Sequence, residues 1–212
     1  IGAYMGFLIA YVSGSTTLGF IFGALGGMAV AAIMALLCVR LGLNQIVIGI
    51  ALTLGAEGIT ALLHNIQFSR TYPRLDAMET LPIPLLSRIP VIGPAVFDRP
   101  VIVYIAILLV FVMIYVFRAT HLGSALQAAG DRPAALDAAG VDVIRTRTVA
   151  VLCTWLFAGL GGAFMSIVGA GVFVPFMTHG NGFIGIVLAM LARGKPLWVL
   201  GGALLFGACL SM

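Results

Sequence analysis

The stretch LGFIFGALGGMAVAAIMALLCV (residues 18–39) sets the fold class of this chain, because it runs for 22 residues without a charged side chain. A helix rises about 1.5 Å per residue, so a run of this length crosses the hydrocarbon core of a bilayer. Arg40 follows and ends the run. Further apolar runs, each with at most one charged residue, cover residues 1–12, 44–64, 101–117, 148–174, 183–192 and 197–212. We therefore predict an all-α polytopic membrane protein with about six to seven transmembrane segments, the terminal ones truncated.

The composition excludes several classes of protein. Of the 212 residues, 62% are hydrophobic and 8% are charged, whereas soluble globular proteins carry roughly 25% charged residues. Soluble enzymes, nucleic-acid-binding proteins and disordered chains are excluded, and the lipid bilayer is the expected surrounding. The net charge of +4 indicates cytoplasmic anchoring residues rather than affinity for nucleic acid. Cys38, Cys153 and Cys209 lie in apolar runs without the spacing of a metal site, so we expect neither a metal nor a disulfide.

Two polar segments interrupt the apolar runs, one at residues 65–99 with five prolines and the other at residues 119–147. If the spans alternate in direction, seven basic residues share the side of the second segment and four share the side of the first. Because Lys and Arg are enriched in cytoplasmic loops, we predict that residues 119–147 are cytoplasmic and residues 65–99 extracytoplasmic. The chain starts at Ile1 inside an apolar run and without an initiator Met. We interpret residues 1–212 as a single transmembrane domain from a longer chain.

Small residues recur at the spacing that packs helices in membranes. Gly19, Gly23 and Gly27 are four residues apart, as are Gly159 and Ala163. Such rows let two helix backbones approach closely, so we expect packing faces in both runs. The apolar run at 183–192 is short and follows a stretch rich in glycine, residues 169–182. We predict a helix that begins after a bent segment there.

The second polar segment has the signals of two short helices. Ser124 can cap an alanine-rich helix that Gly130 ends. Asp131 can cap a second helix with Pro133 in its first turn and Gly140 as its C-terminal stop. Two hypotheses fit this pattern: a solvated helical loop, or a small helical element that docks into a groove of a cytoplasmic partner.

The run LGSALQAAGDRPAALDAAGV (residues 122–141) resembles the cytoplasmic loop of ABC-importer permeases of the ribose and branched-chain amino acid type. It is most similar to the subgroup for nucleoside and simple-sugar uptake, which works with binding proteins of the basic-membrane-lipoprotein kind. The matches to this subgroup follow in the same order along the chain: residues 39–47, 82–97 and 177–186, and then the apolar run that ends in residues 204–207. The resemblance thus extends from about Val39 to Gly207.

The resemblance implies a transport subunit rather than an enzyme, in the plasma (inner) membrane of a prokaryote. Such a permease forms half of a translocation pathway for a nucleoside or simple sugar, together with a second, identical or different permease. Its other partners would be an extracytoplasmic substrate-binding protein and separate ABC ATPase subunits. ATP and Mg²⁺ would bind to the ATPase partner, so we expect no cofactor on this chain. Gly194-Lys195-Pro196 indeed lacks the residues that surround the lysine of a phosphate-binding loop.

By the same resemblance, residues 122–141 would couple the permease to the ATPase. The residues expected at this contact are Gly123, Leu126, Gly130, Asp131, Arg132, Pro133, Ala134, Ala135, Leu136 and Gly140.

Glu57 lies near the middle of the third apolar run, where an ionised side chain costs on the order of 3 kcal/mol. Three hypotheses remain: a neutral acid that fixes helix packing by bonding Thr53 or Thr60, a contact of the pore or of a substrate hydroxyl, and a proton relay. Aromatic, amide and hydroxyl groups suit a heterocyclic base and a ribose. The candidate pathway residues are Glu57, Thr53, Phe173, Phe176, Thr178 and Asn181.

Two other functions are weighed against the importer. An ion-driven secondary transporter should carry several paired acids within the membrane, and Glu57 stands alone in its run. A membrane-embedded enzyme needs a nucleophile with a base, or a metal cluster, and the sequence contains no HExxH motif and no pair of catalytic aspartates. Ser13 and Ser15 are the weak candidates for a serine site.

Overall fold

The computed structural model describes residues 1–69, 71–75, 81–82 and 98–211. The chain divides into two compact units, and each is described by itself. The first unit comprises Ile1–Met78 and Ala125–Met177, and the second comprises Glu79–Ser124 and Thr178–Met212. Most of the proline-rich segment, including most of the residues 82–97 that resemble the permease subgroup, lies outside the described residues.

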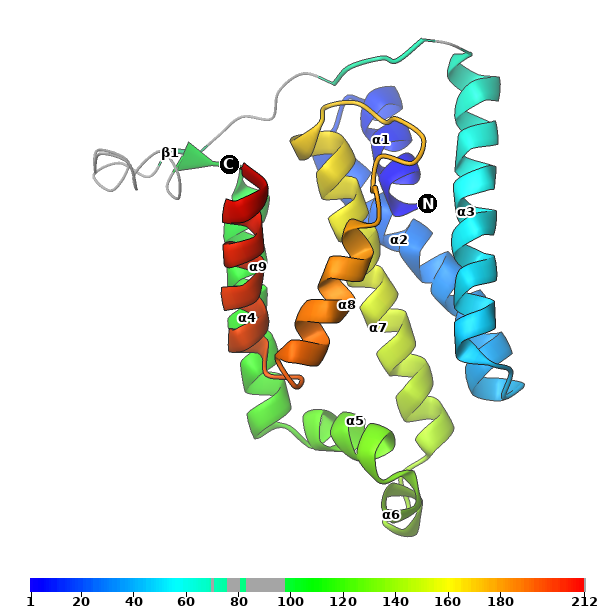
Figure 1. Ribbon diagram of the computed structural model, residues 1–212, viewed down its shortest axis with the longest axis vertical. Helices are drawn as coiled ribbons and strands as arrows, with labels where there is room; N and C mark the ends of the chain where they lie inside the picture. The colour runs from blue at the N-terminus through cyan, green and yellow to red at the C-terminus, as the bar shows by residue number, and fades with distance from the viewer. Residues whose placement is uncertain (70, 76–80, 83–97, 212) are drawn as a thin grey trace. The chain divides into compact units, whose positions relative to one another are not determined.

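The centre of the first unit is a close packing of α1 (Gly2–Ser13), α2 (Thr16–Met34) and α7 (Val143–Phe164) (Figure 1). A β-carbon added at Gly23 would lie 2.6 Å from the Ala163 β-carbon, and one added at Gly27 would lie 3.0 Å from the Gly159 α-carbon. As the residue number rises by four on α2, its partner's number falls by four on α7, so the two helices run antiparallel. The predicted small-residue rows are therefore confirmed as packing faces.

The helices α2 and α7 each end in a π-helical turn. α2 continues into η1 (Ala35–Arg40), and α7 continues into η3 (Met165–Gly169). In η3, the buried Ser166 hydroxyl donates a hydrogen bond of 2.9 Å to the Ala3 carbonyl oxygen of α1. This bond ties the end of α7 to α1 and satisfies a polar side chain within the core.

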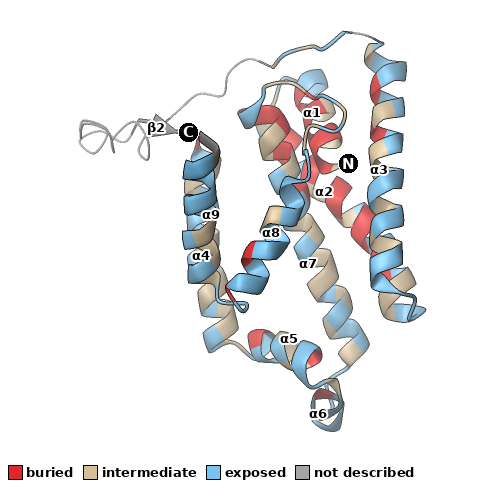
Figure 2. Ribbon diagram, in the orientation of Figure 1, coloured by how far each residue is buried: buried red, intermediate tan, exposed pale blue. Residues whose placement is uncertain are grey.

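The helix α3 (Gln45–Phe68) exposes apolar side chains and buries polar ones, which is the reverse of a helix in a soluble protein. The Asn44 side chain caps its first turn by accepting from the N–H groups of Ile46 and Val47. In α3, all of which the structure describes, the two buried residues are Thr60 and His64, and the rest of the helix is half-buried or exposed (Figure 2). Apolar side chains that face outward and polar ones that face the protein are what a lipid surrounding requires.

The second unit contains α4 (Val101–Ala119), α8 (Asn181–Leu191) and α9 (Pro196–Ser211). α4 and α9 pack along each other, and α8 contacts α9 (Figure 1). The strand β1 (Leu81–Pro82) pairs antiparallel with β2 (Asp98–Arg99), just before α4 begins. The predicted bent stretch before α8 is confirmed: after η3, residues 170–180 form no helix.

The predicted polytopic fold is confirmed. Within the described residues, four helical segments are long and apolar enough to cross a membrane: Thr16–Arg40, Gln45–Phe68, Val101–Ala119 and Val143–Gly169. Three shorter apolar helices accompany them: Gly2–Ser13, Asn181–Leu191 and Pro196–Cys209. The chain is a multi-pass membrane protein.

Two predicted boundaries are wrong by about one turn. α3 continues past His64 to Phe68, and α7 begins at Val143 instead of Thr148. At the end of α3, Gln67 accepts a hydrogen bond of 2.7 Å from the Tyr4 hydroxyl and thereby holds the extra turn against α1. At the start of α7, the Asp142 side chain caps the helix by accepting from the Arg145 N–H, so the helix begins before Thr148. Polar residues at both ends thus take part in helices instead of loops.

Candidate functional site

The first candidate site is the pair of short helices α5 (His121–Asp131) and α6 (Pro133–Ala138), joined at Arg132 (Figure 1). The predicted helix–corner–helix arrangement is confirmed, but two of its caps are wrong. Ser124 lies inside α5 and donates to the His121 carbonyl, while the Thr120 hydroxyl accepts from the Gly123 N–H at 3.2 Å. Thr120 takes this role because α5 starts one turn earlier than predicted.

The corner between the two helices does not use Asp131 as a cap. Asp131 is the last residue of α5, and Arg132 precedes α6 without a capping side chain. Pro133 occupies the first turn of α6 as predicted, where its missing N–H costs nothing. Gly140 ends this helix as predicted, with a φ of 77°, and the Val141 N–H bonds the Leu136 carbonyl at 3.2 Å. These contacts form the glycine-terminated stop that the sequence indicated.

The residues predicted to contact the ATPase fall into two groups. Gly123 and Leu136 are buried and hold the helices in place, and Leu126 and Pro133 are half-buried. The exposed group, which is available to a partner, consists of Gly130, Asp131, Arg132, Ala134, Ala135 and Gly140. The two groups therefore differ in role: one shapes the pair of helices, and the other forms its surface.

Gly123 makes the tight turn from α4 into α5 possible. A β-carbon there would lie 2.6 Å from the Phe117 α-carbon and would also overlap the Val116 carbonyl. The Thr120 hydroxyl bridges the same turn, since it donates to the Val116 carbonyl at 2.6 Å while accepting from Gly123. Any residue larger than glycine must push the two helices apart at this point.

Arg147 connects the short helices to the long helix α7. Its guanidinium donates two hydrogen bonds to the Ala129 carbonyl oxygen in the last turn of α5, from Nε at 3.2 Å and from Nη2 at 3.0 Å. Ala129 itself is buried, with 3% of its surface exposed. A cation at the carboxyl end of a helix also interacts favourably with the helix dipole. No local sequence pattern indicates this contact, because it joins residues 18 positions apart.

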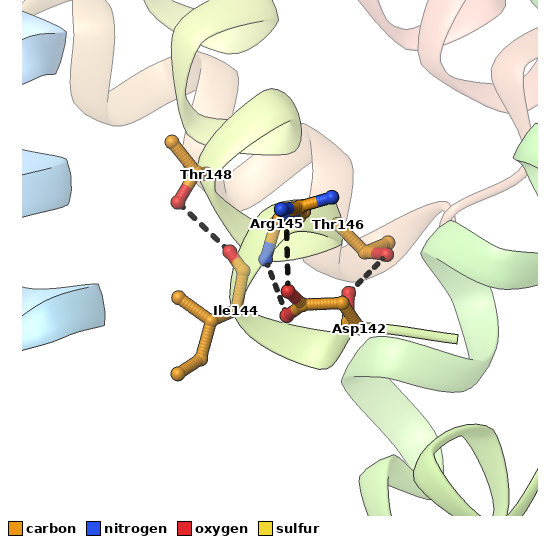
Figure 3. A network of polar contacts seen from close by, with 5 residues as sticks. All are labelled: Asp142, Ile144, Arg145, Thr146 and Thr148. Atoms are coloured by element: carbon orange, nitrogen blue, oxygen red, sulfur yellow. Dashed lines mark hydrogen bonds and ion pairs between the residues drawn. The ribbon is translucent and has the colours of Figure 1, made fainter. Parts of the chain in front are cut away.

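The first turn of α7 is held by Asp142 (Figure 3). Its carboxylate accepts from the Arg145 N–H at 3.0 Å and lies 3.2 Å from Arg145 Nε. The Thr146 hydroxyl donates to the Asp142 carbonyl at 2.9 Å, and the Thr148 hydroxyl donates to the Ile144 carbonyl at 2.8 Å. This network is local to the turn, whereas Arg147 reaches across to α5.

The second candidate site is one face of α3. Thr53, Glu57, Thr60, His64 and Gln67 follow at steps of four, three, four and three residues. With 3.6 residues per turn, this spacing places all five side chains on the same face of the helix. Two of the predicted pathway residues, Thr53 and Glu57, thus belong to a longer polar row, which we call the polar face of α3. Its spacing was visible in the sequence, but only Glu57 and the two threonines were singled out.

The hydroxyls of Thr53 and Thr60 donate to backbone carbonyls of α3. The Thr53 hydroxyl donates its single proton to the Gly49 carbonyl at 2.9 Å. The Thr60 hydroxyl donates to the carbonyls of Ala56 at 2.8 Å and Glu57 at 3.1 Å. Both hydroxyl protons are therefore given to the helix backbone and not to the Glu57 side chain. Each hydroxyl oxygen can still accept a proton from a neutral carboxyl group, so the hypothesis that Glu57 fixes packing through Thr53 or Thr60 stays a prediction.

The ring of Phe173 contacts the polar face of α3 at His64. Their ring centroids lie 5.5 Å apart, and Phe173 also meets Tyr4 of α1 edge-on at 5.3 Å. The structure thereby brings Phe173, from the segment after η3, to the helix that carries Glu57. Phe176 is exposed and has a φ of 64°.

The remaining predicted pathway residues, Thr178 and Asn181, lie at the start of α8 in the second unit. The Asn181 N–H donates to the Thr178 carbonyl at 2.8 Å, and the bond closes a turn before the helix. Thr178 is half-buried and Asn181 is exposed. The predicted pathway residues are thus divided between two units.

The described part of the chain contains no candidate metal site, since no three His, Cys, Asp or Glu side chains gather there.

The long apolar helices, which turn polar residues inward, define a multi-pass membrane protein that carries an exposed pair of short helices. The chain belongs to the family described as the permease component of branched-chain amino acid transport systems, whose model matches residues 1–212. No solved structure matches it significantly.

Several curated proteins are similar to the chain. TsgC13 of Haloferax volcanii, named for a glucose ABC transporter permease, is 37% identical over 98% of this chain and 63% of its own length. The nucleoside ABC transporter permease NupC of Lactococcus lactis is 30% identical over 92% of the chain and 62% of its own length. The guanosine ABC transporter permease NupQ of Bacillus subtilis is 29% identical over 89% of the chain and 61% of its own length. The chain thus spans a little under two thirds of each of these relatives.

Proposed function

We propose that this chain is part of the transmembrane permease subunit of an ATP-driven ABC importer for a nucleoside or simple sugar. The observation that carries the proposal is the exposed α5–α6 pair, which Arg147 ties to the long helix α7. A rigid element that is exposed on one side and bonded to a membrane helix on the other can transmit movement from a partner. The family and the names of the similar permeases support the same function.

The proposed partners follow from the division of labour in such a transporter. A separate ATPase subunit would bind ATP and Mg²⁺ and would hold the surface formed by Gly130, Asp131, Arg132, Ala134 and Ala135. A second permease, identical or different, would complete the pathway, and an extracytoplasmic binding protein would deliver the substrate. This chain would act in transport and not as an enzyme. The α5–α6 pair would then face the cytoplasm of a prokaryote.

The polar face of α3 is our candidate for part of the pathway. It offers hydrogen-bonding groups along a helix whose other sides are mainly apolar, and Glu57 lies half-buried at its middle. An acid within a membrane helix is expensive and is best accounted for by a function. The hydroxyl protons of Thr53 and Thr60 go to the backbone, so in our proposal the Glu57 carboxyl group contacts a substrate hydroxyl.

A bulky substitution on the exposed surface tests the docking proposal. Ala135→Trp places a large ring on α6 where the alanine is exposed, so the permease should fold but should no longer retain the ATPase. The control is Ala51→Trp, at an exposed position of α3 away from its polar face. Co-purification of the full-length permease with its ATPase measures the effect. Normal ATPase binding and uptake by the Ala135 variant would contradict docking at this surface.

A further inference from the structure

The two buried residues of α3 differ in how their polar groups are satisfied. The Thr60 hydroxyl bonds the backbone of its own helix. His64 has 2% of its surface exposed, and its Nε2 atom has no hydrogen-bond partner among the residues that the structure describes. A buried polar atom without a partner is costly, so each one in a native fold calls for an explanation.

Aromatic rings from separate segments surround His64. Phe68, one turn further along α3, lies with its centroid 5.3 Å away, and Phe173 lies at 5.5 Å. Tyr72 stacks on the imidazole at 5.3 Å, with an angle of 25° between the ring planes. Stacked rings at this separation present flat faces that suit another ring equally well.

Among these aromatic side chains, Tyr72 can move away from His64 with the least change to the packing. It lies outside the helices and has 53% of its surface exposed, whereas Phe173 is buried. The neighbouring backbone is held independently, because the Leu75 N–H donates to the Gly171 carbonyl at 2.8 Å. Movement of the Tyr72 side chain would therefore uncover one face of His64 without unfolding the segment.

We propose that His64 is a substrate contact at the end of the polar face of α3. A ring-shaped solute that carries hydroxyl groups, such as a nucleoside or a hexose, displaces Tyr72 and stacks on the imidazole, while a hydroxyl of the solute hydrogen bonds to Nε2. Phe173, whose ring centroid lies 5.5 Å from that of His64, forms another wall of the site. This inference rests on the proposed importer function, and it places the contact at the extracytoplasmic end of α3 in the proposed orientation.

Two substitutions with opposite expected effects test the site in the full-length transporter. His64→Phe keeps a ring of similar size but removes Nε2, so the KM for uptake should rise about tenfold through the lost hydrogen bond. Tyr72→Ala removes the ring that competes with the solute, so the KM should fall about fivefold. Loss of stability alone would not move the two values in opposite directions. His64→Gln, which restores a hydrogen-bonding group, should recover part of the affinity.

The measurement is ATP-driven uptake of labelled guanosine and of labelled glucose by proteoliposomes that contain the complete transporter. Asn65→Leu is the control, since Asn65 is an exposed polar residue of α3 away from the polar face. The solute whose KM responds identifies the substrate class. An unchanged KM in His64→Phe for whichever solute is transported, or a raised KM in Tyr72→Ala, would overturn the site and leave the importer proposal standing. Absence of ATP-driven uptake of both solutes by the unaltered transporter would overturn the importer proposal and the site with it.

Discussion

Replacing Arg147 by methionine should uncouple the short helices from α7. Methionine keeps an unbranched, flexible stem but has no donors, so both hydrogen bonds to the Ala129 carbonyl are lost. A hydrogen bond that involves a charged group contributes about 1.5–3 kcal/mol, and the buried carbonyl left behind adds to the cost. Taking about 2 kcal/mol for the contact, the ratio of attached to detached α5 should fall about 30-fold.

Two assays follow this change. Amide hydrogen exchange in α5 should become faster, because detachment exposes the last turn of the helix. In proteoliposomes with the ATPase subunits, substrate transported per ATP hydrolysed should fall, while the amount of assembled complex stays near that of the unaltered protein. The first assay measures attachment and the second measures its consequence for transport.

Arg145→Met is the matched control. Arg145 lies two residues earlier on the same helix, its side chain is 88% exposed, and its ion pair with Asp142 is confined to the first turn of α7 (Figure 3). Exposed pairs of this kind contribute little, so transport should change hardly at all. Equal uncoupling in the two variants, or normal transport by Arg147→Met, would refute the assignment of Arg147 as the connecting residue.

Three further substitutions have defined outcomes. Gly23→Val should lower the free energy of unfolding of the detergent-solubilised protein by about 1–3 kcal/mol, since its β-carbon would lie 2.6 Å from that of Ala163. The control is Gly49→Ala, which should not destabilise the protein because nothing lies within 4 Å of the new β-carbon. Glu57→Gln should leave assembly intact and reduce uptake, and failure to assemble would instead favour a packing role. Gly123→Ala should lower the amount of folded protein in the membrane, because the new β-carbon would lie 2.6 Å from the Phe117 α-carbon; normal expression would show that the turn can widen.

The glycine rows and the corner of the cytoplasmic loop show how much local sequence can predict here. The rows at Gly23 and Ala163 were assigned to packing from spacing alone, because close approach in a membrane depends on small side chains whatever the partner. Pro133 and Gly140 marked the limits of α6 because each acts through its own backbone. Capping by Ser124 and Asp131 was predicted wrongly, since several residues near a helix start can cap it and the chain path selects among them.

Hydropathy and small-residue spacing act within single segments, so the amino-acid sequence alone was enough to predict a multi-pass helical membrane protein. It also determined the permease family through the run at residues 122–141. The hydrogen bonds from Arg147 to the Ala129 carbonyl and the contact between Phe173 and His64 became visible only in the folded chain. Both pairs join residues distant in the chain, and no local pattern encodes which distant carbonyl or ring a side chain will reach. The physical reason is that such contacts depend on how whole helices pack, which is settled by the sum of many weak interactions.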